Sequence, residues 1–289
     1  MLPMALKPKT IKIRNRVFDW SHTYVMGVLN ITPDSFSDGG RYLKTEDALK
    51  QAIHLVNGGA DILDIGGESS RPFSKPVSVD EEIARTLPVI KAIRKQGIEI
   101  PISIDTTKSQ VAEQALMAGA DIINDISAMR FDPDMAGLAA DLNAPVVLMH
   151  MKGSPRDMQI SPDYKGDVVK EIKRFLEDRI KHACDSGIKQ ENIIIDPGIG
   201  FGKTFDHNLE ILNRLEELVA IGQPVLIGAS RKAFLGAITG IESPADRDVA
   251  TLGITSICAM KGIHIVRVHQ TKKTCQILKV MEAVQQQHI

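Results

Sequence analysis

This sequence has few cysteines, few aromatic residues and no long apolar segment. Cys184, Cys258 and Cys275 lie far apart and lack CxxC spacing, so they indicate buried thiols in a reducing compartment rather than disulfides or a zinc site. No apolar run approaches the roughly 20 residues needed to span a bilayer. The start of the chain also lacks the apolar core of a signal peptide. We therefore expect a cytoplasmic protein with no membrane partner.

Charge of one sign is also missing. The chain has 35 basic and 36 acidic residues, a formal net charge of -1. General nucleic-acid binders carry a basic excess, so this balance predicts no nucleic-acid partner while leaving room for a local basic pocket. The hydrophobic fraction of 43% and the charged fraction of 25% are typical of a globular protein. Because a length of 289 residues suits one α/β barrel, we expect residues 1–289 to form a single domain.

Eight apolar, β-branched runs recur along the chain, and each is followed by a helical pattern. The runs are 24–31, 61–66, 100–105, 121–126, 145–150, 192–196, 224–228 and 263–269. Most are nearly continuous, which is typical of parallel strands buried on both faces. Eight strand–helix units predict an α/β fold, a TIM (β/α)8 barrel. Residues 10–18 predict a short N-terminal β-hairpin, turning at Arg14 and Asn15, that covers the bottom of the barrel.

Helix starts and helical spacing support this reading. Ser78-x-x-Glu81 and Thr107-x-x-Gln110 have the capping-box pattern, which predicts a helix beginning at each. Residues 171–186 and 209–220 carry apolar side chains at three- and four-residue spacing and predict two further helices.

A polar or charged residue lies at the end of every predicted strand or just after it. These residues are Asn30, the run Glu68 to Pro72, Asp105, Asn124 with Asp125, Met149 with His150, Asp196, the run Ser230 to Lys232, and Arg267 with His269. Active sites of such barrels lie at the C-terminal ends of the strands. We therefore expect these side chains to converge on one site.

Two kinds of chemistry are present in this set. Arginines offer a planar fork of donors to phosphate oxygens, so an anion suits Asn30, Arg71, Arg267 and His269. Carboxylates and amides read the N–H edge of a planar heterocycle such as a pterin, which suits Asp105, Asn124, Asp196 and Lys232.

A structural role is the alternative for several of these residues. Asp105, Asp196 and Lys232 would then form a buried salt-bridge cluster, although unpaired buried charges are costly and favour a site that a ligand completes. His150 has the position of a core histidine. The glycine-rich stretch 198–203 resembles a phosphate loop but lacks Walker spacing, so it predicts a strand-to-helix turn with Phe201 aimed at the site.

The ordered set of motifs resembles the dihydropteroate synthase family over nearly the whole chain. The motifs are Asn30-Ile31-Thr32-Pro33-Asp34-Ser35-Phe36, Gly66-Gly67-Glu68-Ser69-Ser70-Arg71-Pro72, Asp105-Thr106, Asn124-Asp125, Met149-His150-Met151, Asp196-Pro197-Gly198-Ile199-Gly200-Phe201-Gly202-Lys203, Ser230-Arg231-Lys232 and Arg267-Val268-His269. The resemblance implies condensation of 6-hydroxymethyl-7,8-dihydropterin pyrophosphate with p-aminobenzoate to dihydropteroate and pyrophosphate. It also implies sulfonamides as competitors and a homodimer formed through the outer helices.

Residue roles follow from the resemblance. The residues implied to hold the pterin are Asp105, Asn124, Asp196 and Lys232, with Met149 and Arg267 sandwiching its ring. The residues implied to hold the pyrophosphate are Asn30, Arg71, Arg267 and His269. The residues implied to shape the p-aminobenzoate pocket are Phe36, Ser70, Pro72, Phe201, Ser230 and Lys232. The resemblance also implies Mg²⁺ as cofactor, contacted by Asn30.

Charge considerations suggest an SN1-like course. Pyrophosphate leaves once its developing charge is neutralised, and the resulting pterin-conjugated methylene cation is stabilised by Asp105 and Asp196 before the arylamine attacks. We count Asp105, Asp196, Lys232 and Asn30 as the candidate catalytic residues. Residues 32–40 would form a lid that orders when both substrates are bound.

Two other functions remain open at this stage. A methyltetrahydrofolate-binding methyltransferase domain would need no pyrophosphate site, so Arg71, Arg267 and the Ser230–Lys232 run argue against it. A non-catalytic pterin-binding homologue would be expected to lose Asn30, Asp105 or Lys232. The chain departs from the family pattern at Ser70, Phe73 and Gln270, none of which is assigned to the pterin.

Overall fold

The computed structural model describes residues 7–31, 41–70 and 74–287. Its elements, in chain order, are β1 (Ile11–Ile13), β2 (Arg16–Phe18), β3 (Tyr24–Asn30), α1 (Arg41–Asn57), β4 (Ile62–Gly66), α2 (Val79–Lys95), β5 (Ile102–Asp105), α3 (Ser109–Met117), β6 (Ile122–Asp125), α4 (Met135–Asp141), β7 (Val146–Met149), α5 (Val168–Asp185), η2 (Gln190–Asn192), β8 (Ile193–Asp196), α6 (Phe205–Asn213), α7 (Leu215–Val219), β9 (Leu226–Ile227), α8 (Ala233–Thr239), η3 (Pro244–Arg247), α9 (Asp248–Met260), β10 (Ile265–Val268) and α10 (Thr271–Gln285).

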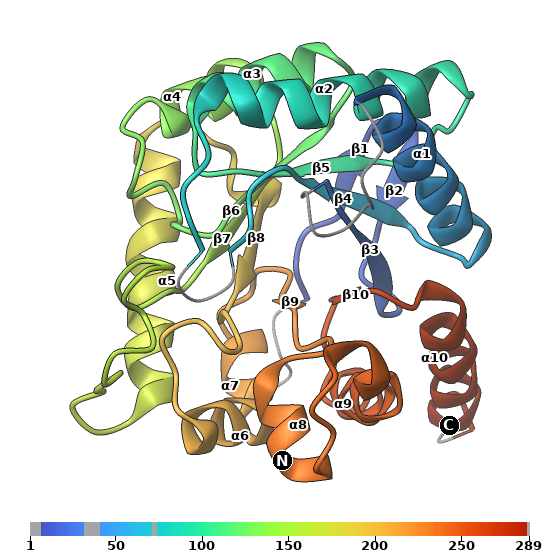
Figure 1. Cartoon of the computed structure of the whole chain (residues 1–289). Coiled ribbons are helices and arrows are strands. Elements are labelled where there is room, and N and C mark those ends of the chain that lie inside the picture. The colour runs from blue at the N-terminus through green and yellow to red at the C-terminus, as the bar shows by residue number, and fades with distance from the viewer. Residues whose placement is uncertain (1–6, 32–40, 71–73, 288–289) are drawn as a thin grey trace.

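Eight parallel strands form the central sheet, in the order β8-β7-β6-β5-β4-β3-β10-β9. The two end strands meet through a parallel bridge between Ile195 and Val225, which brings the sheet round into a barrel. Helices surround the strands, with α2 to α4 along one side and α6 to α9 along the opposite side (Figure 1). The predicted TIM barrel is confirmed, although the strand predicted at 224–228 shortens to Leu226–Ile227.

The predicted hairpin is also confirmed. β1 and β2 pair antiparallel, with Ile13 opposite Arg16, and Arg14 adopts the left-handed conformation that the tight turn requires (φ 56°). Ile11, Ile13 and Phe18 are buried in one cluster with residues from the beginnings of the barrel strands, such as Met26 and Ile62. The hairpin therefore fills the N-terminal end of the barrel.

Helix starts match the sequence only in part. The Ser78 side chain accepts a hydrogen bond from the Glu81 backbone N–H at 3.2 Å and begins α2, as predicted. The capping box predicted at Thr107 is wrong, because α3 begins at Ser109. The Ser109 backbone N–H at its start donates instead to Asp132, in the loop between β6 and α4, at 2.7 Å. A side chain distant in sequence thus replaces the local cap.

The helix predicted over 171–186 is confirmed by α5, but the one predicted over 209–220 is split. Arg214 separates α6 from α7 with non-helical dihedral angles (φ −117°, ψ 29°). Its guanidinium binds both oxygens of Asp167 at the start of α5, at 2.8 and 2.9 Å. Among the described residues, no helix is both long enough and apolar enough to cross a membrane.

Candidate active site

Strand register brings the expected residues to the C-terminal rim of the barrel. The rim pairs between neighbouring strands are Asn30 with Gly66, Gly66 with Asp105, Asp105 with Asn124, and Met149 with Asp196. Parallel strands place their carboxyl ends on the same side of a sheet, so these side chains share one end of the barrel. Asn30 is half-buried, while Met149 and Asp196 are buried.

An ion-pair network occupies the barrel interior just below this rim. Arg267 donates from Nε to Asp64 at 2.5 Å and from Nη2 to Asp105 at 2.8 Å. The Asn124 amide donates to both carboxylate oxygens of Asp64, at 3.2 and 3.3 Å. Asp64 therefore orients the guanidinium and the amide together.

Burial sets the charges in this network. Removal from water raises the pKa of Asp105; Arg267 opposes the shift and the neighbouring Asp64 adds to it. Burial alone would lower the pKa of Arg267, but the two carboxylates hold it above its ordinary value. The guanidinium thus stays charged, and Asp105 is a carboxyl group poised to interact with a polar ligand edge.

Asp196 and Lys232 form the opposite side of the site. Burial raises the pKa of Asp196 to about 6, although a hydrogen bond from the Gly198 N–H at 2.7 Å and the nearby Lys232 oppose the shift. Burial and Arg267 lower the pKa of Lys232 to about 8. The Lys232 Nζ lies 4.1 Å from the centroid of the Phe201 ring. Phe201 therefore lies beside Lys232 and contacts it by a cation–π interaction.

Ser230 and His269 lie side by side, just after the neighbouring strands β9 and β10. The Ser230 Oγ lies 2.9 Å from the His269 Nδ1. Burial, followed by the charges of Arg231 and Arg267, lowers the pKa of His269 to about 3. His269 is therefore neutral at physiological pH and offers a hydrogen bond, rather than a charge, to an anion.

Lys203 is a buried amine to which the sequence patterns give no role, and burial lowers its pKa to about 7. Its Nζ lies 3.0 Å from the His150 Nδ1 and donates to the Phe201 carbonyl at 3.0 Å. Burial lowers the pKa of His150 well below its ordinary value, so the imidazole is neutral and available as an acceptor. His150 is thus the buried core histidine expected from its position, and the pair anchors the turn that carries Phe201.

Met149 lies in a small apolar cluster beside this turn. The cluster consists of Met149, Met151, Met158 and Phe201, all buried, with Ile126 packed against it. Methionine side chains adapt to flat surfaces through dispersion contacts. The cluster gives the site one apolar wall opposite the charged groups.

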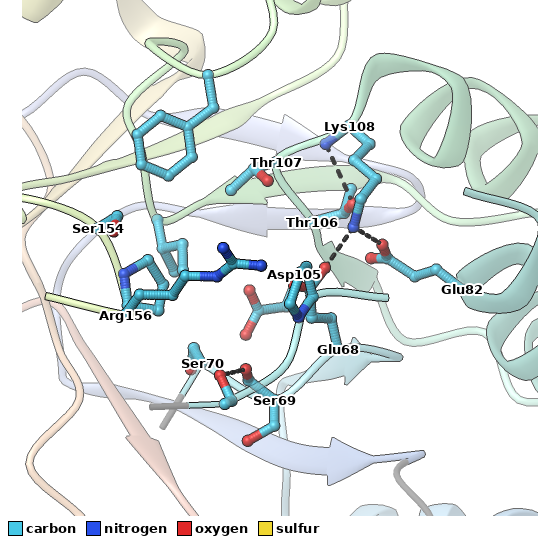
Figure 2. Close-up of a pocket in the computed structure, with 15 residues that line it drawn as sticks. Glu68, Ser69, Ser70, Glu82, Asp105, Thr106, Thr107, Lys108, Ser154 and Arg156 are labelled. Atoms are coloured by element: carbon cyan, nitrogen blue, oxygen red, sulfur yellow. Dashed lines mark hydrogen bonds and ion pairs between the residues drawn. The ribbon is translucent and has the colours of Figure 1, made fainter. Parts of the chain in front are cut away.

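A cavity of about 240 Å³ extends the site sideways above the ends of β4 to β7. Asp105 and Ser70 line it, together with Glu68, Lys108 and Arg156. Figure 2 shows Lys108 between Glu68 and Glu82, and the Arg156 guanidinium extending into the cavity toward Asp105. Lys108 and Arg156 thus bring positive charge to a cavity that is also lined by Glu68, Glu82 and Asp105.

Several predicted residues lie outside the described part of the chain. They are Phe36, Arg71, Pro72 and Phe73, together with the predicted lid at 32–40. Gln270, a departure from the family pattern, directly precedes α10 as its N-cap residue.

Two sequence interpretations need revision. Asp64 was not singled out, although a carboxylate inside the apolar run Ile62 to Gly66 signals a buried partner, since an unpaired charge there would be costly. Arg231 was grouped with Lys232 as evidence for an anion site. In the structure its guanidinium binds both oxygens of Asp248, at 2.7 and 3.1 Å. The charge of Arg231 is therefore already paired with Asp248 rather than directed at an anion.

A protein-only metal centre is not formed by the described residues, since no group of three or more His, Cys, Asp or Glu side chains is placed to bind an ion. Asn30 offers one amide oxygen at the rim. A hard oxygen donor of this kind suits Mg²⁺, which usually keeps several waters and binds through one or two protein ligands together with substrate phosphates.

Comparisons with known proteins agree with this geometry. A family model described as "Pterin binding enzyme" matches residues 26–269. A dihydropteroate synthase from Synechocystis sp. is 46% identical over 278 residues, covering 96% of each chain.

Solved structures of the same kind superpose closely. A Xanthomonas albilineans dihydropteroate synthase with 4-aminobenzoic acid has a TM-score of 0.90 and 41% identity, covering 96% of this chain and 99% of its own. Another from that organism, in complex with 7,8-dihydropteroate, has a TM-score of 0.86 and 40% identity over 96% and 99% of the two chains. A Yersinia pestis enzyme in a sulfonamide drug complex has a TM-score of 0.90 and 39% identity over 96% and 100%. This chain belongs to the dihydropteroate synthase family of pterin binding enzymes.

Proposed function

We propose that this protein is a transferase of folate biosynthesis that condenses 6-hydroxymethyl-7,8-dihydropterin pyrophosphate with p-aminobenzoate, giving 7,8-dihydropteroate and pyrophosphate. The observation that carries the proposal is the buried charged network of Asp64, Asp105 and Arg267, facing Asp196 and Lys232 across the barrel. Two such opposed sets suit a planar heterocycle with donors and acceptors on its edges. Homologues with bound 4-aminobenzoic acid and with bound 7,8-dihydropteroate support the second substrate and the product.

The pterin is proposed to lie in the barrel interior. Asp105, Asn124, Asp196 and Lys232 hold its polar edges. The apolar wall at Met149 contacts one face, and Arg267 lies against the other. The pKa shifts support this assignment, because burial disfavours the charges of Asp196 and Lys232 until a ligand supplies hydrogen bonds to them.

The pyrophosphate is proposed to lie at the rim near Asn30, Arg71, Arg267 and His269. The Arg267 guanidinium supplies charge, and neutral His269 supplies a hydrogen bond. Asn30 and the phosphate oxygens would hold Mg²⁺ there. When bound, the ion neutralises charge on the leaving group. This assignment agrees with the single amide oxygen that Asn30 presents.

The arylamine is proposed to bind above the pterin, between Phe201, Ser230 and Lys232, with Phe36, Ser70 and Pro72 completing the pocket. The cation–π contact between Lys232 and Phe201 supports a flat, partly positive surface that suits the ring and carboxylate of p-aminobenzoate. Sulfonamides would compete for this place, as the drug complex of the Yersinia pestis homologue suggests.

The reaction is proposed to follow an SN1-like course. The bond between the methylene carbon and the pyrophosphate oxygen breaks first and leaves a cation conjugated to the pterin. Asp105 and Asp196 stabilise that charge at fixed positions. The amine nitrogen of p-aminobenzoate then forms the new C–N bond and loses a proton. An arylammonium is a strong acid, so no strong general base is required.

We further propose that the protein acts as a cytoplasmic homodimer of single-domain barrels. The three free thiols, Cys184, Cys258 and Cys275, are consistent with a reducing compartment. Neighbouring helices α8, α9 and α10 expose large apolar side chains that suit a protein interface. These side chains are Ile238, Val249, Met260, Val280 and Val284. Light scattering of the purified protein tests the dimer.

Pyrophosphate release on mixing both substrates, with dihydropteroate identified by mass spectrometry, tests the proposed function. Asp105→Ala and Lys232→Ala are each expected to lower kcat/KM by about 100-fold or more, because each removes a buried group that contacts the pterin. Lys12→Ala, at an exposed position of the hairpin, is the control and should match the parent protein. Full activity in both site variants would overturn the assignment. Methyl transfer from methyltetrahydrofolate without pyrophosphate release would instead identify the methyltransferase alternative.

A further inference from the structure

The turn between β9 and α8 has an unfavourable backbone conformation at its centre. Arg231 adopts φ 60°, in the left-handed region that side chains with a Cβ rarely occupy. Ser230 and Lys232, on either side of it, are two of the residues proposed to bind p-aminobenzoate. Some feature outside the site must therefore hold this turn in place, since a strained conformation persists only when its surroundings fix it.

The start of α9 holds the turn through Arg231 itself. Both Asp248 oxygens accept from the Arg231 guanidinium, at 2.7 and 3.1 Å, in a bidentate pair. The Arg231 backbone N–H donates to the Thr251 Oγ1 at 3.1 Å. The side chains of Arg231 and Asp248 are 23% and 14% exposed, so water screens the pair only in part.

Arg247 holds the same turn from its carbonyl side. Its Nη1 donates to the Arg231 carbonyl at 3.1 Å and to the Lys232 carbonyl at 3.3 Å. Its Nε donates to the Ile241 carbonyl at 2.9 Å. A Cβ at position 236 would lie only 2.7 Å from the guanidinium, so a larger residue than Gly236 would displace Arg247 from this position. Figure 1 shows α8 and α9 adjacent below β9 and β10.

The held turn aims two side chains in two directions. Ser230 reaches His269, at 2.9 Å, on the side proposed for the pyrophosphate. Lys232 reaches the Phe201 ring, at 4.1 Å, on the side proposed for the arylamine. A small rotation at Arg231 would move both, and misplacement by about 1 Å in an active site can cost on the order of 100-fold in rate.

We propose that Arg231, Asp248, Thr251 and Arg247 form a clamp of positioning residues that fixes Ser230 and Lys232 for p-aminobenzoate from outside the barrel. Within this clamp, Arg231 acts through the conformation of the turn and does not contact substrate. The proposal rests on the proposed function, because it concerns the second substrate of that reaction. Lys232 also contacts the pterin, but Asp105, Asn124 and Asp196 lie outside the turn and still hold it. The clamp therefore predicts that its damage affects p-aminobenzoate more than the pterin pyrophosphate.

The decisive comparison is Arg231→Ala against Arg231→Gly. Both remove the pair with Asp248, but glycine adopts a positive φ without strain whereas alanine does not. We expect Arg231→Ala to raise KM for p-aminobenzoate about tenfold or more, with the Kd of the pterin pyrophosphate within about threefold of the parent. Arg231→Gly should recover a large part of that increase. Equal KM values in Arg231→Ala and Arg231→Gly, or an unchanged KM in both, would overturn the clamp.

Thr251→Val gives a second test that leaves the ion pair intact. It removes the acceptor of the Arg231 N–H while keeping the shape of the side chain, and a KM increase of about threefold for p-aminobenzoate is expected. Circular dichroism and the melting temperature show that each variant is folded. An unchanged KM in folded Thr251→Val counts against the clamp. The two proposals fail differently: a parent protein that releases no pyrophosphate refutes the function, whereas an active parent with insensitive variants refutes only the clamp.

Discussion

The two ends of this barrel are built from the same strands and have opposite contents. At the N-terminal end, Phe18 and the rest of the hairpin pack against apolar side chains such as Met26 and Ile265. At the C-terminal end, the interior holds Asp64, Asp105 and Arg267 instead. Apolar burial stabilises a fold, whereas buried charge is costly unless paired. Within the barrel interior, apolar packing is therefore concentrated at one end and the chemistry at the other.

The largest effect, on the free energy of unfolding, is expected from a substitution at the apolar end. Phe18 is 1% exposed, and its ring packs 4.7 Å from that of Tyr24. Phe18→Ala is expected to lower the free energy of unfolding by about 3–5 kcal/mol, because it removes buried ring surface and leaves a cavity. Urea denaturation measures this loss. The kcat of the folded fraction should stay within about twofold of the parent, and a large loss of kcat would show that the two ends are not separable.

A smaller effect, on kcat/KM alone, is expected when the two aspartates in and next to β4 are compared. Asp61 directly precedes β4, and Asp64 lies at the centre of that strand. Asp64 binds Arg267, whereas Asp61 accepts from the Val25 N–H at 2.9 Å at the bottom. Asp64→Asn should lower kcat/KM by about 100-fold, because the Asn amide would present a donor to the guanidinium that Asp64 orients.

The matched control for that variant is Asp61→Asn. An amide oxygen still accepts from Val25, so kcat/KM should change little. Steady-state kinetics of the two variants gives the comparison directly. Equal losses in both would mean that charge anywhere along β4, rather than its place at the rim, governs the rate.

The pH dependence sharpens the picture of the charged end. Asp105 and Asp196 must be ionised to stabilise the pterin cation, and Lys232 must be protonated to hold the pterin. Burial shifts the pKa values of these three groups to about 7, about 6 and about 8. Below about pH 7 first Asp105 and then Asp196 becomes neutral, and above about pH 8 Lys232 loses its charge. We expect kcat/KM to be bell-shaped, falling about tenfold per pH unit outside this window. In Lys232→Arg the alkaline limb should disappear, since arginine stays charged; a limb that persists would assign it to another group.

Sequence patterns predicted the barrel because each strand is an apolar run of the right length, and because the hairpin has its turn residues in place. They predicted the rim because strand ends are visible as the points where apolar runs stop. Asn30, Asp105, Asn124 and Asp196 all lie where that rule places them.

Contacts between residues that are distant in sequence leave no local pattern from which to predict them. Asp64 lies within a strand, so its role depends on Arg267 and Asn124 across the barrel. The pairing of Lys203 with His150 depends on how the turn after β8 folds back against the end of β7. Arg231 shares a motif with Lys232, yet its direction is decided by Asp248, 17 residues later. The start of α3 likewise depends on Asp132 rather than on Thr107.

The hairpin at the bottom of the barrel also determines the end from which substrates enter. Among the described residues, Ile11, Ile13 and Phe18 fill that end, so we expect substrates to reach the proposed site from the C-terminal end of the barrel. A molecule bound in the interior must enter before the one that sits nearer the mouth, and it leaves after it. For the proposed reaction, we therefore expect the pterin pyrophosphate to bind first and p-aminobenzoate to bind second, above it.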